Sequence, residues 1–450
     1  AGWGRVCVFL QRLGKKADSS SLSLAHCDLT ATDLLELATL LHFLPRLEEV
    51  DVSWNELIGG CLDALTSHLH HVGGIRALRL CSCEALGCVP LLEILDLSWN
   101  GSVGGGVGGL QGLLGKLRPP LREIHLVACQ LTAADAAALG KKLSQEVDGS
   151  VGGFRELAAS LSHAASLTTL RLQACGLTTG GSLRCLPAVR QLDLSCNKGL
   201  SGGLDLLTPH LAHLTHLESL HLHLCCLTHT DLEALIQALP SLTALAELDV
   251  SSNEEAGGVV HPLVSALPLT QMKRLPLNSC SLTEASFTAL ALAVPFLRSV
   301  DVSWCKVVGG RLPLLLDALQ PSVVLELRLS SCELTTDDLR HLAVASGRGR
   351  LSSLRVLDLS YNGSAGDAGW SALFAAGGLG SLEDLDLSLR PSTSASCSAW
   401  LPALLGALPR LPALTRLAAQ RWALGPRERR HCFSSSRRTN VSAPTGENNR

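Results

Sequence analysis

Histidines are concentrated in one short stretch of the chain, and neutral imidazole is a common zinc ligand. The stretch holds His210, His213, His216, His221, His223 and His229. The spacing of His210 and His213 fits one turn of a helix, whereas His221 and His223 fit one face of a strand. We expect the helix with His210 and His213 and the strand with His221 and His223 to lie on opposite sides of the protein. The two pairs of histidines would then point away from each other. One pair supplies too few ligands for zinc, and we predict no metal site.

Motifs for catalysis and for nucleotide binding are absent from the sequence. The glycine-rich run Gly104–Gly109 is not followed by Gly-Lys-Ser/Thr, and neither Gly-x-Ser-x-Gly nor His-Glu-x-x-His occurs. The formal charge of −3 gives no reason to expect a nucleic-acid partner. No apolar run reaches the length of about eighteen residues that indicates a membrane-spanning helix. We therefore predict a protein that is not an enzyme, needs no cofactor and does not insert into membranes.

Two leucine-rich motifs alternate along almost the whole chain of 450 residues. The first reads Leu-x-Leu-x-x-Cys-x-Leu-Thr and begins at Leu22; the second reads Leu-Asp-Leu-Ser-Trp-Asn, and its first copy begins at Val50. The steps from Leu22 to Val50 and from Val50 to Leu78 are both 28 residues. That length suffices for a short strand, a helix of about three turns and two loops. The sequence predicts an α/β solenoid that forms one elongated domain.

Signals for the helices recur within these repeats. Apolar residues after Thr30 follow helical spacing, at Leu34, Leu37, Ala38, Leu41 and Leu44. The sequence Thr-x-x-Asp, at Thr228 and again at Thr335, is typical of a helix start. Only 3% of the residues are aromatic, so we expect a core of Leu, Ala and Val rather than of large rings.

The alternation of a Cys-type repeat ending in Leu-Thr with an Asn-type repeat ending in Gly-Gly resembles the ribonuclease-inhibitor-like class of leucine-rich-repeat proteins. Within that class, the recurrent Asp-Leu/Val-Ser-Trp-Asn and Val-Gly-Gly elements are most similar to the leucine-rich repeat-containing protein 31 group. The resemblance covers about Leu22 to Leu424. It implies a horseshoe with parallel strands on the concave face, helices on the convex face, and a function in binding rather than catalysis.

The domain boundaries follow from where the pattern runs. We expect residues 1–21 to be a partial N-terminal repeat at the start of a fragment, residues 22–424 a solenoid of about fifteen alternating repeats, and residues 425–450 a basic disordered tail. Three intervals, 78–95, 124–170 and 170–192, are shorter than the period requires. A protein with these gaps would have an interrupted concave sheet with unpaired backbone groups, so our hypothesis is that the short intervals reflect an incomplete or mis-spliced gene model.

The middle residue of each Leu-x-Leu faces outward, by the two-residue period of strands. The Asn-type repeats place an acid there: Asp51, Asp96, Asp193, Asp249, Asp301, Asp358 and Asp386. The Cys-type repeats place basic or neutral residues there: Ser23, Arg79, His125, Arg171, His221, Pro276 and Arg328. Two interpretations stay open: lateral pairs that cancel repulsion within the sheet, and a polar strip that binds a partner.

An aromatic ring follows several of the acidic strands, at Trp54, Trp99, Trp304 and Tyr361, whereas Cys196 and Ser252 take the same position elsewhere. Tryptophan and tyrosine dominate the energetics of protein interfaces, although a packing role is the alternative. We predict that these rings and the outward strand residues bind a protein partner of unknown identity, and that the protein itself is a monomer.

Seven of the 17 cysteines share the interior turn position of the Cys-type repeat: Cys27, Cys83, Cys129, Cys175, Cys225, Cys280 and Cys332. Cysteine acts there as a small buried residue, and free thiols indicate a reducing, cytoplasmic location. Asn takes the same position in the other repeats, so the glycosylation sequons at Asn100 and Asn362 are expected to point inward. Only the sequon at Asn440 lies in an expected exposed segment.

Three functions fit this pattern. The first is a protein-binding scaffold or adaptor that uses the concave face. The second is acceleration of a small GTPase, as in some leucine-rich-repeat relatives. The third is inhibition of a ribonuclease, which family resemblance alone suggests.

Overall fold

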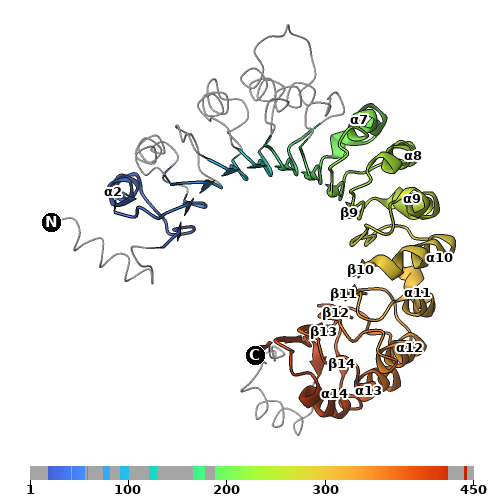
Figure 1. Ribbon diagram of the computed structural model, residues 1–450. Coiled ribbons are helices and arrows are strands. Elements are labelled where there is room, and N and C mark those ends of the chain that lie inside the picture. Colours follow the sequence, from blue (N-terminus) through green and yellow to red (C-terminus); the bar gives the residue numbers. More distant parts are fainter. Residues whose placement is uncertain are drawn as a thin grey trace. The chain divides into compact units, whose positions relative to one another are not determined.

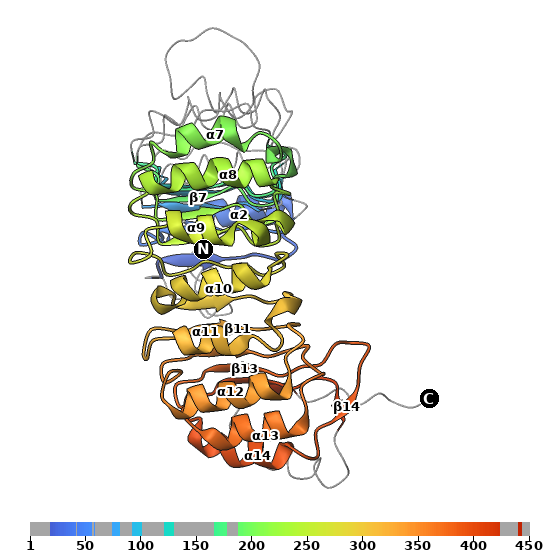
Figure 2. The same ribbon diagram turned by 90° about the vertical axis from the view of Figure 1, so that its right-hand side faces the viewer.

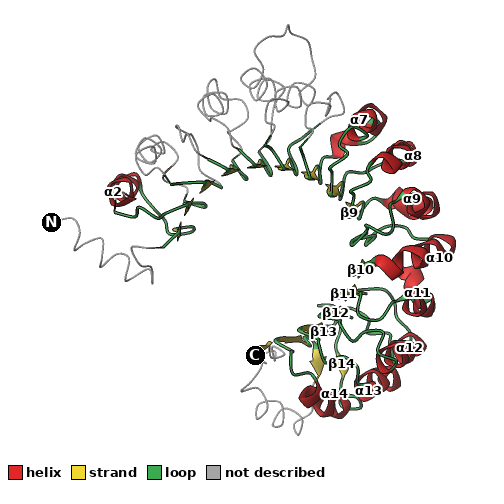
Figure 3. Cartoon of the chain, viewed as in Figure 1, coloured by secondary structure: helices red, strands yellow, loops and turns green. Residues whose placement is uncertain are grey.

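The computed structural model describes residues 19–41, 43–55, 58, 74–81, 92–100, 121–129, 166–177, 188–423 and 440–442. The chain divides into two compact units, Ala1–Ala244 and Leu245–Arg450. In each unit the short strands line one side and the described helices line the other (Figure 1). Loops join the strands to the helices (Figure 3). This is the α/β leucine-rich-repeat solenoid that the sequence predicts.

The first unit contains one parallel sheet in which each strand pairs with the next along the chain. The strands are β1 (Ser21–Ser23), β2 (Glu49–Asp51), β3 (Ala77–Arg79), β4 (Ile94–Asp96), β5 (Glu123–His125), β6 (Thr169–Arg171), β7 (Gln191–Asp193) and β8 (Ser219–His221). The helices are α2 (Ala31–Leu41), α7 (Leu204–Leu211) and α8 (His229–Ala238), with 3-10 turns η2 (Lys198–Leu200) and η3 (Leu239–Ser241). The apolar spacing predicted after Thr30 is confirmed, because Leu34, Leu37, Ala38 and Leu41 are the buried residues of α2.

The three short intervals do not interrupt this sheet, and the expectation that they would is wrong. Leu78 pairs with Leu95, Ile124 with Leu170, and Leu170 with Leu192. A three-residue strand and its flanking turn are enough to complete the ladder: the amide of Leu80 still donates to the carbonyl of Asp96 at 2.9 Å. The three short intervals therefore lack residues from the segments between strands and not from the strands. Residues 82–91, 130–165 and 178–187 of those segments lie outside the described residues.

The second unit repeats this arrangement of strands and helices. Its strands are β9 (Glu247–Asp249), β10 (Ser299–Asp301), β11 (Glu326–Arg328), β12 (Val356–Asp358), β13 (Asp384–Asp386), β15 (Arg416–Ala418) and β17 (Asn440–Ser442), with β14 (Ala395–Ser396) and β16 (Trp422–Ala423) as a separate pair. Its helices, stacked as successive rungs in Figure 2, are α9 (Val260–Ala266), α10 (Glu284–Ala293), α11 (Leu312–Ala318), α12 (Thr336–Gly347), α13 (Asp367–Ala376) and α14 (Leu401–Ala407). The 3-10 turns are η4 (Glu254–Val259), η5 (Val294–Phe296), η6 (Lys306–Val308) and η7 (Leu408–Arg410).

Two positions in the second unit differ from the simple repeat. Between β9 and β10 the chain makes only isolated bridges, through Arg274, since the following Pro276 has no backbone N–H to donate to a ladder. Within the segment 425–450, which was expected to be a tail, β17 pairs in parallel with β15. The side chain of Asn440 and the rest of that segment lie outside the described structure.

Asn side chains close the interior of the Asn-type repeats. The amide nitrogen of Asn55 donates to the carbonyls of Leu24 and Val52, and its oxygen accepts from the amides of Cys27 and Leu29. Asn100 and Asn362 are 2% and 1% exposed, which confirms that these two sequons face inward.

Cysteines close the Cys-type repeats. The described members Cys129, Cys175, Cys225, Cys280 and Cys332 are buried and free, as predicted. Their thiols donate to a carbonyl of the preceding repeat, as from Cys129 to Leu97 at 3.1 Å, and burial raises the pKa of Cys129 to about 12. Cys83 lies outside the described residues. Cys27 is exposed, contrary to expectation, because no earlier strand within the described structure covers it.

Large rings do fill part of the core, which corrects the expectation drawn from composition. Trp370, Phe374, Trp400 and Trp422 form a buried cluster near the last repeats, with ring centroids 4.9 to 6.4 Å apart. The indole of Trp422 donates to the carbonyl of Leu387 at 2.7 Å. Four of the aromatic residues thus fill the core near the last repeats, and Phe287 is buried separately in α10.

The predicted helix starts are confirmed as capping boxes. Thr228 and Asp231 exchange hydrogen bonds at the start of α8, and Thr335 and Asp338 do so at α12. A third box, at Thr283 with Ser286, escaped the sequence pattern because serine replaces the acid. The carboxylate of Asp231 also accepts from the amides of Gly202 and Leu204, at 2.8 and 2.9 Å. One acid therefore joins two successive repeats.

Acidification should weaken this link between repeats. Burial acts to raise the pKa of Asp231, but the hydrogen bonds from Gly202, Thr228 and Leu204 outweigh it and hold that pKa below the usual value. A lowered folded pKa stabilises the fold above the unfolded pKa of about 3.9 and loses that contribution as the pH falls. We expect the Asp231→Asn variant to lose less stability than the wild type between pH 7 and pH 3 in urea titrations. Equal losses would contradict this role.

Candidate functional site

The outward strand residues form a row across the sheet of each unit, here called the strand face. In the first unit the register aligns Ser23, Asp51, Arg79, Asp96, His125, Arg171, Asp193 and His221. In the second unit it aligns Asp301, Arg328, Asp358, Asp386 and Ala418, and Asp249 ends β9. Acid and base mostly alternate, as the sequence predicts. The exceptions are His125 beside Arg171 and Asp358 beside Asp386.

Every aspartate of the strand face has a structural hydrogen bond that the sequence analysis missed. One carboxylate oxygen accepts from the backbone N–H two residues later, at 2.9 to 3.0 Å in all seven cases. The acceptors are Asp51, Asp96, Asp193, Asp249, Asp301, Asp358 and Asp386, and the donor is always a serine. The recurrent Asp-x-Ser sequence is the signal of this Asx turn. One oxygen of each aspartate is therefore used to stabilise the turn after the strand, and only the other oxygen is left for a partner.

In the first unit the second carboxylate oxygen also has a partner. Oδ2 of Asp51 accepts from the hydroxyl of Ser23 at 3.2 Å. Oδ2 of Asp96 lies 3.6 Å from Nδ1 of His125, and Oδ2 of Asp193 lies 3.9 Å from Nδ1 of His221. Burial acts to raise the pKa of Asp96 and Asp193, but these histidines and the Ser hydrogen bonds outweigh it and hold both pKa values low. Lateral pairing within the sheet thus accounts for this row.

In the second unit the acids are less fully paired. Oδ2 of Asp386 lies 3.5 Å from the guanidinium of Arg416. Within the described residues, Oδ2 of Asp301 and Oδ2 of Asp358 make no hydrogen bond or ion pair, because Arg328 between them turns to Glu326 at 3.5 Å. Burial raises the pKa of Asp301. This part of the strand face retains carboxylate oxygens that a partner can use.

The basic residues of the row differ in accessibility. Arg79 pairs with Glu49 at 2.8 Å, and Arg171 is exposed. His125, expected to face a partner, is only 7% exposed and lies between Asp96 and Glu123, with Nε2 of His125 3.4 Å from Oε2 of Glu123. Its ring is enclosed by its neighbours, and it serves the sheet rather than a free surface.

The predicted aromatic residues stand on a backbone of unusual conformation. Trp54, Trp99, Trp304 and Tyr361 have φ between 61° and 64°, the left-handed region that side chains other than glycine seldom adopt. The amide of each residue donates to a carbonyl of the next repeat, as from Trp54 to Cys81 at 2.8 Å and from Trp304 to Ser330 at 2.8 Å. Such cross-repeat bonds hold the strained conformation in place. They fix the rings at the edge of the strand face, where Trp99 and Trp304 are 55% and 53% exposed.

These rings contact one another within each unit. In the first unit the rings of His26 and Trp54 stack with centroids 5.6 Å apart, and Trp54 lies 6.0 Å from Trp99. In the second unit Trp304 and Tyr361 meet edge to face at 5.8 Å. The guanidinium of Arg390 lies 5.9 Å from the centre of the Trp304 ring, a cation–π contact. His26 and Arg390 belong to these clusters, and neither was predicted from the sequence.

Comparison with known proteins agrees with the repeat geometry. A family model described as Leucine Rich repeat matches residues 350–374. The chain is 30% identical over 421 residues to the ribonuclease inhibitor of Sus scrofa, an alignment that covers 85% of this chain and 89% of the pig protein. The chain belongs to the ribonuclease inhibitor family of leucine-rich-repeat proteins. The ribonuclease inhibitor of Mus musculus is 28% identical over 379 residues, covering 75% of this chain and 81% of the mouse protein.

A solved structure with a similar backbone is an internalin (inlF) from Listeria monocytogenes. It matches with a TM-score of 0.42 and 16% sequence identity, over 94% of this chain and 96% of that chain.

The histidines near α7 and β8 do not form a metal site or a catalytic group among the described residues. His210 lies in the last turn of α7 and His221 ends β8, and no group of three or more metal-ligating side chains gathers among the described residues. Oγ of Ser219 lies 2.9 Å from Nε2 of His221, but Nδ1 of His221 is 3.9 Å from Asp193, too far for a hydrogen bond that would orient the ring. No described helix is long and apolar enough to span a bilayer.

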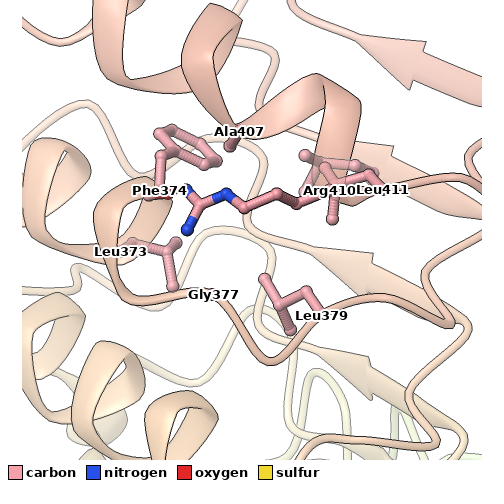
Figure 4. Close-up of a pocket in the computed structure, with 8 residues that line it drawn as sticks. Leu373, Phe374, Gly377, Leu379, Ala407, Arg410 and Leu411 are labelled. Atoms are coloured by element: carbon pink, nitrogen blue, oxygen red, sulfur yellow. Dashed lines mark hydrogen bonds between the residues drawn. The ribbon is translucent and has the colours of Figure 1, made fainter.

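A small pocket in the second unit is apolar and partly filled. Leu373, Phe374, Leu379 and Leu411 line it, and the side chain of Arg410 extends across it (Figure 4). The guanidinium of Arg410 donates to the carbonyls of Phe374 and Ala375 at the end of α13, at 2.7 and 3.3 Å. Arg410 therefore caps a helix, and the pocket brings together no group for chemistry.

Proposed function

We propose that this protein is a non-enzymatic scaffold or adaptor that binds a protein partner through the strand face. The observation that carries the proposal is that the strand face of the second unit has an exposed ring, Trp304, together with Oδ2 of Asp301 and Oδ2 of Asp358, which make no hydrogen bond or ion pair within the described residues. A rigid aromatic residue beside available polar groups is the composition of an interface hot spot. Membership of a family built for binding supports the same function.

Affinity capture from tissue extract tests this proposal. The test variant combines Trp304→Ser with Asp358→Asn, since the amide oxygen of Asn can still accept from the amide of Ser360. The matched control, Leu206→Ser with Leu292→Ser, alters exposed residues of α7 and α10 instead. We expect recovery of the partner to fall by about tenfold or more with the test variant and to stay unchanged with the control. Identical recovery with both would overturn the assignment of the strand face.

A regulator of an enzyme is the second candidate, because the relatives named above are ribonuclease inhibitors. The strand face of the second unit offers aromatic and acidic groups that suit a basic ribonuclease. Inhibition of a pancreatic-type ribonuclease by the purified chain would support this candidate, and full ribonuclease activity at a molar excess of the chain would remove it. Nothing in the described residues favours activation of a small GTPase.

We also infer that, within the family, the chain groups with leucine-rich repeat-containing protein 31. The recurrent Asp-Leu/Val-Ser-Trp-Asn motif supports this inference, because its Asp, Ser and Asn make the same hydrogen bonds in successive copies. A phylogenetic tree that separates the chain from that group would contradict the inference. The free interior thiols support a reducing, cytoplasmic location, and localisation by microscopy tests it.

A further inference from the structure

An exposed arginine with a glycine on each side lies at the end of helix α12. It is Arg348, the only arginine of the sequence that has glycine as both neighbours. Its side chain is exposed and makes no hydrogen bond or ion pair within the described residues. Helix α12 lies among the helices of the second unit and not on the strand face (Figure 1). Another protein can therefore reach this guanidinium without competing for the strand face.

The glycine after Arg348 is required by the way the helix ends. Gly349 has φ of 76°, a conformation in which any side chain would be strained. Its amide donates to the carbonyl of Ser346 at 2.9 Å, and the amide of Arg350 donates to the carbonyl of Ala345 at 3.1 Å. These two bonds form a Schellman motif, which ends the helix and fixes the backbone around Arg348.

The glycine before Arg348 has no such structural reason. Gly347 is the last residue of α12 and is helical. A Cβ atom added there would lie 3.9 Å from the carbonyl oxygen of Ala376, which is ordinary van der Waals contact. Glycine is less favourable than alanine in a helix, so the fold alone favours alanine at this position. What glycine provides on both sides is space around the Arg348 side chain, which suits entry of that side chain into a narrow enzyme pocket.

The second arginine of the segment is held by the fold. Nη1 of Arg350 donates to three carbonyls at the end of α11, those of Leu316, Asp317 and Leu319, the first and last at 3.2 and 3.3 Å. These bonds satisfy carbonyl groups that the helix itself leaves free. A modification of this guanidinium would break them. The structure thus distinguishes two arginines that the sequence Gly-Arg-Gly-Arg presents as alike.

We propose that Arg348 is a methylation site for a protein arginine methyltransferase. In this reaction a guanidinium nitrogen of Arg348 attacks the methyl carbon of S-adenosylmethionine. A C–N bond forms, the C–S bond of the sulfonium breaks, S-adenosylhomocysteine leaves as a neutral thioether, and the guanidinium releases one proton. The product keeps its positive charge, which is favourable at the C-terminus of a helix, and loses an N–H donor. The fold therefore accepts the modification, and the site is independent of the proposed binding of a partner on the strand face.

Incubation of the folded whole chain with a type I protein arginine methyltransferase and S-adenosylmethionine tests this inference. Mass spectrometry of proteolytic fragments assigns each methyl group to one arginine. The matched variants Arg348→Lys and Arg350→Lys each remove one arginine and keep the charge. We expect methylation at residue 348 in the wild type and in Arg350→Lys, and about tenfold less incorporation in Arg348→Lys. Circular dichroism spectra that match the wild type establish that the variants fold.

A glycine- and arginine-rich peptide serves as the positive control for the enzyme. An unmodified chain alongside a methylated control peptide would overturn the inference, and so would methylation of Arg350 in place of Arg348. Equal methylation of Arg311 would overturn it as well. That arginine has glycine on one side only and donates to the carboxylate of Glu284 at 3.1 Å, so we expect it to stay unmodified.

Discussion

Replacing Gly257 with alanine should destabilise the protein by about 2–4 kcal/mol, whereas the same change at the adjacent Gly258 should have almost no effect. A Cβ atom on Gly257 would lie far inside van der Waals contact with the backbone carbonyl of Ser281 in the next repeat. A Cβ on Gly258 would meet nothing within 4 Å. Backbone cannot rotate away as a side chain can, so the two repeats must separate.

Urea unfolding of the two alanine variants measures this difference. Gly258→Ala is the matched control, because it makes the same chemical change one residue away in the same 3-10 turn, η4. We expect the free energy of unfolding of that control to lie within about 0.5 kcal/mol of the wild type. A Gly257→Ala variant as stable as the control would show that the repeats are not packed this closely.

The same close approach occurs at Gly309, whose added Cβ would collide with the carbonyl of Glu333. Gly257 and Gly309 are each the first glycine of a Gly-Gly pair in an Asn-type repeat. The sequence pattern marks this pair as the end of a repeat, but it does not explain why the first position must be glycine. Contact between the backbones of successive repeats supplies that reason, and it depends on how the repeats stack.

The features that follow from local periodicity could be predicted from the sequence. The 28-residue step set the strand positions, the helical spacing after Thr30 gave the buried face of α2, and the Leu-x-Leu rule placed Asp193 and His221 on one row. Each of these depends only on the direction in which a side chain leaves its own backbone. The inward orientation of Asn100 and Asn362 belongs to the same class.

Features that depend on neighbouring repeats could not be predicted in this way. The hydrogen bond that Asp51 and its equivalents accept from a serine amide is an exception, because it is local and the recurrent Asp-x-Ser spacing signals it. His125 is outward by position and still enclosed, because Asp96 and Glu123 lie on either side of it. Trp54 and Trp99 are in contact and both have positive φ, a conformation that single-strand rules do not predict.

Replacing Asn197 with alanine should cost about 3–5 kcal/mol, the largest effect we expect from a single polar side chain here. Asn197 is fully buried, and its amide nitrogen donates to the carbonyls of Leu172, Leu194 and Ser195 at 2.8, 2.7 and 3.2 Å. Its oxygen accepts from the amides of Cys175 and Leu177 at 2.9 and 3.1 Å. Alanine leaves these buried backbone groups without that partner.

Two further variants separate the hydrogen bonds of Asn197 from its bulk. Lys198→Ala, at the exposed neighbouring residue, should leave the free energy of unfolding within about 0.5 kcal/mol of the wild type. Asn197→Asp keeps the shape and the acceptor but places a carboxylate beside three carbonyls, so its folded pKa should rise above the unfolded value of about 3.9. A raised folded pKa means that the folded state binds the proton more tightly, and the protonated acid can donate again. The deficit of Asn197→Asp relative to the wild type should therefore shrink as the pH falls from 7 to 4, and a deficit independent of pH would show that the donor bonds of Asn197 contribute little.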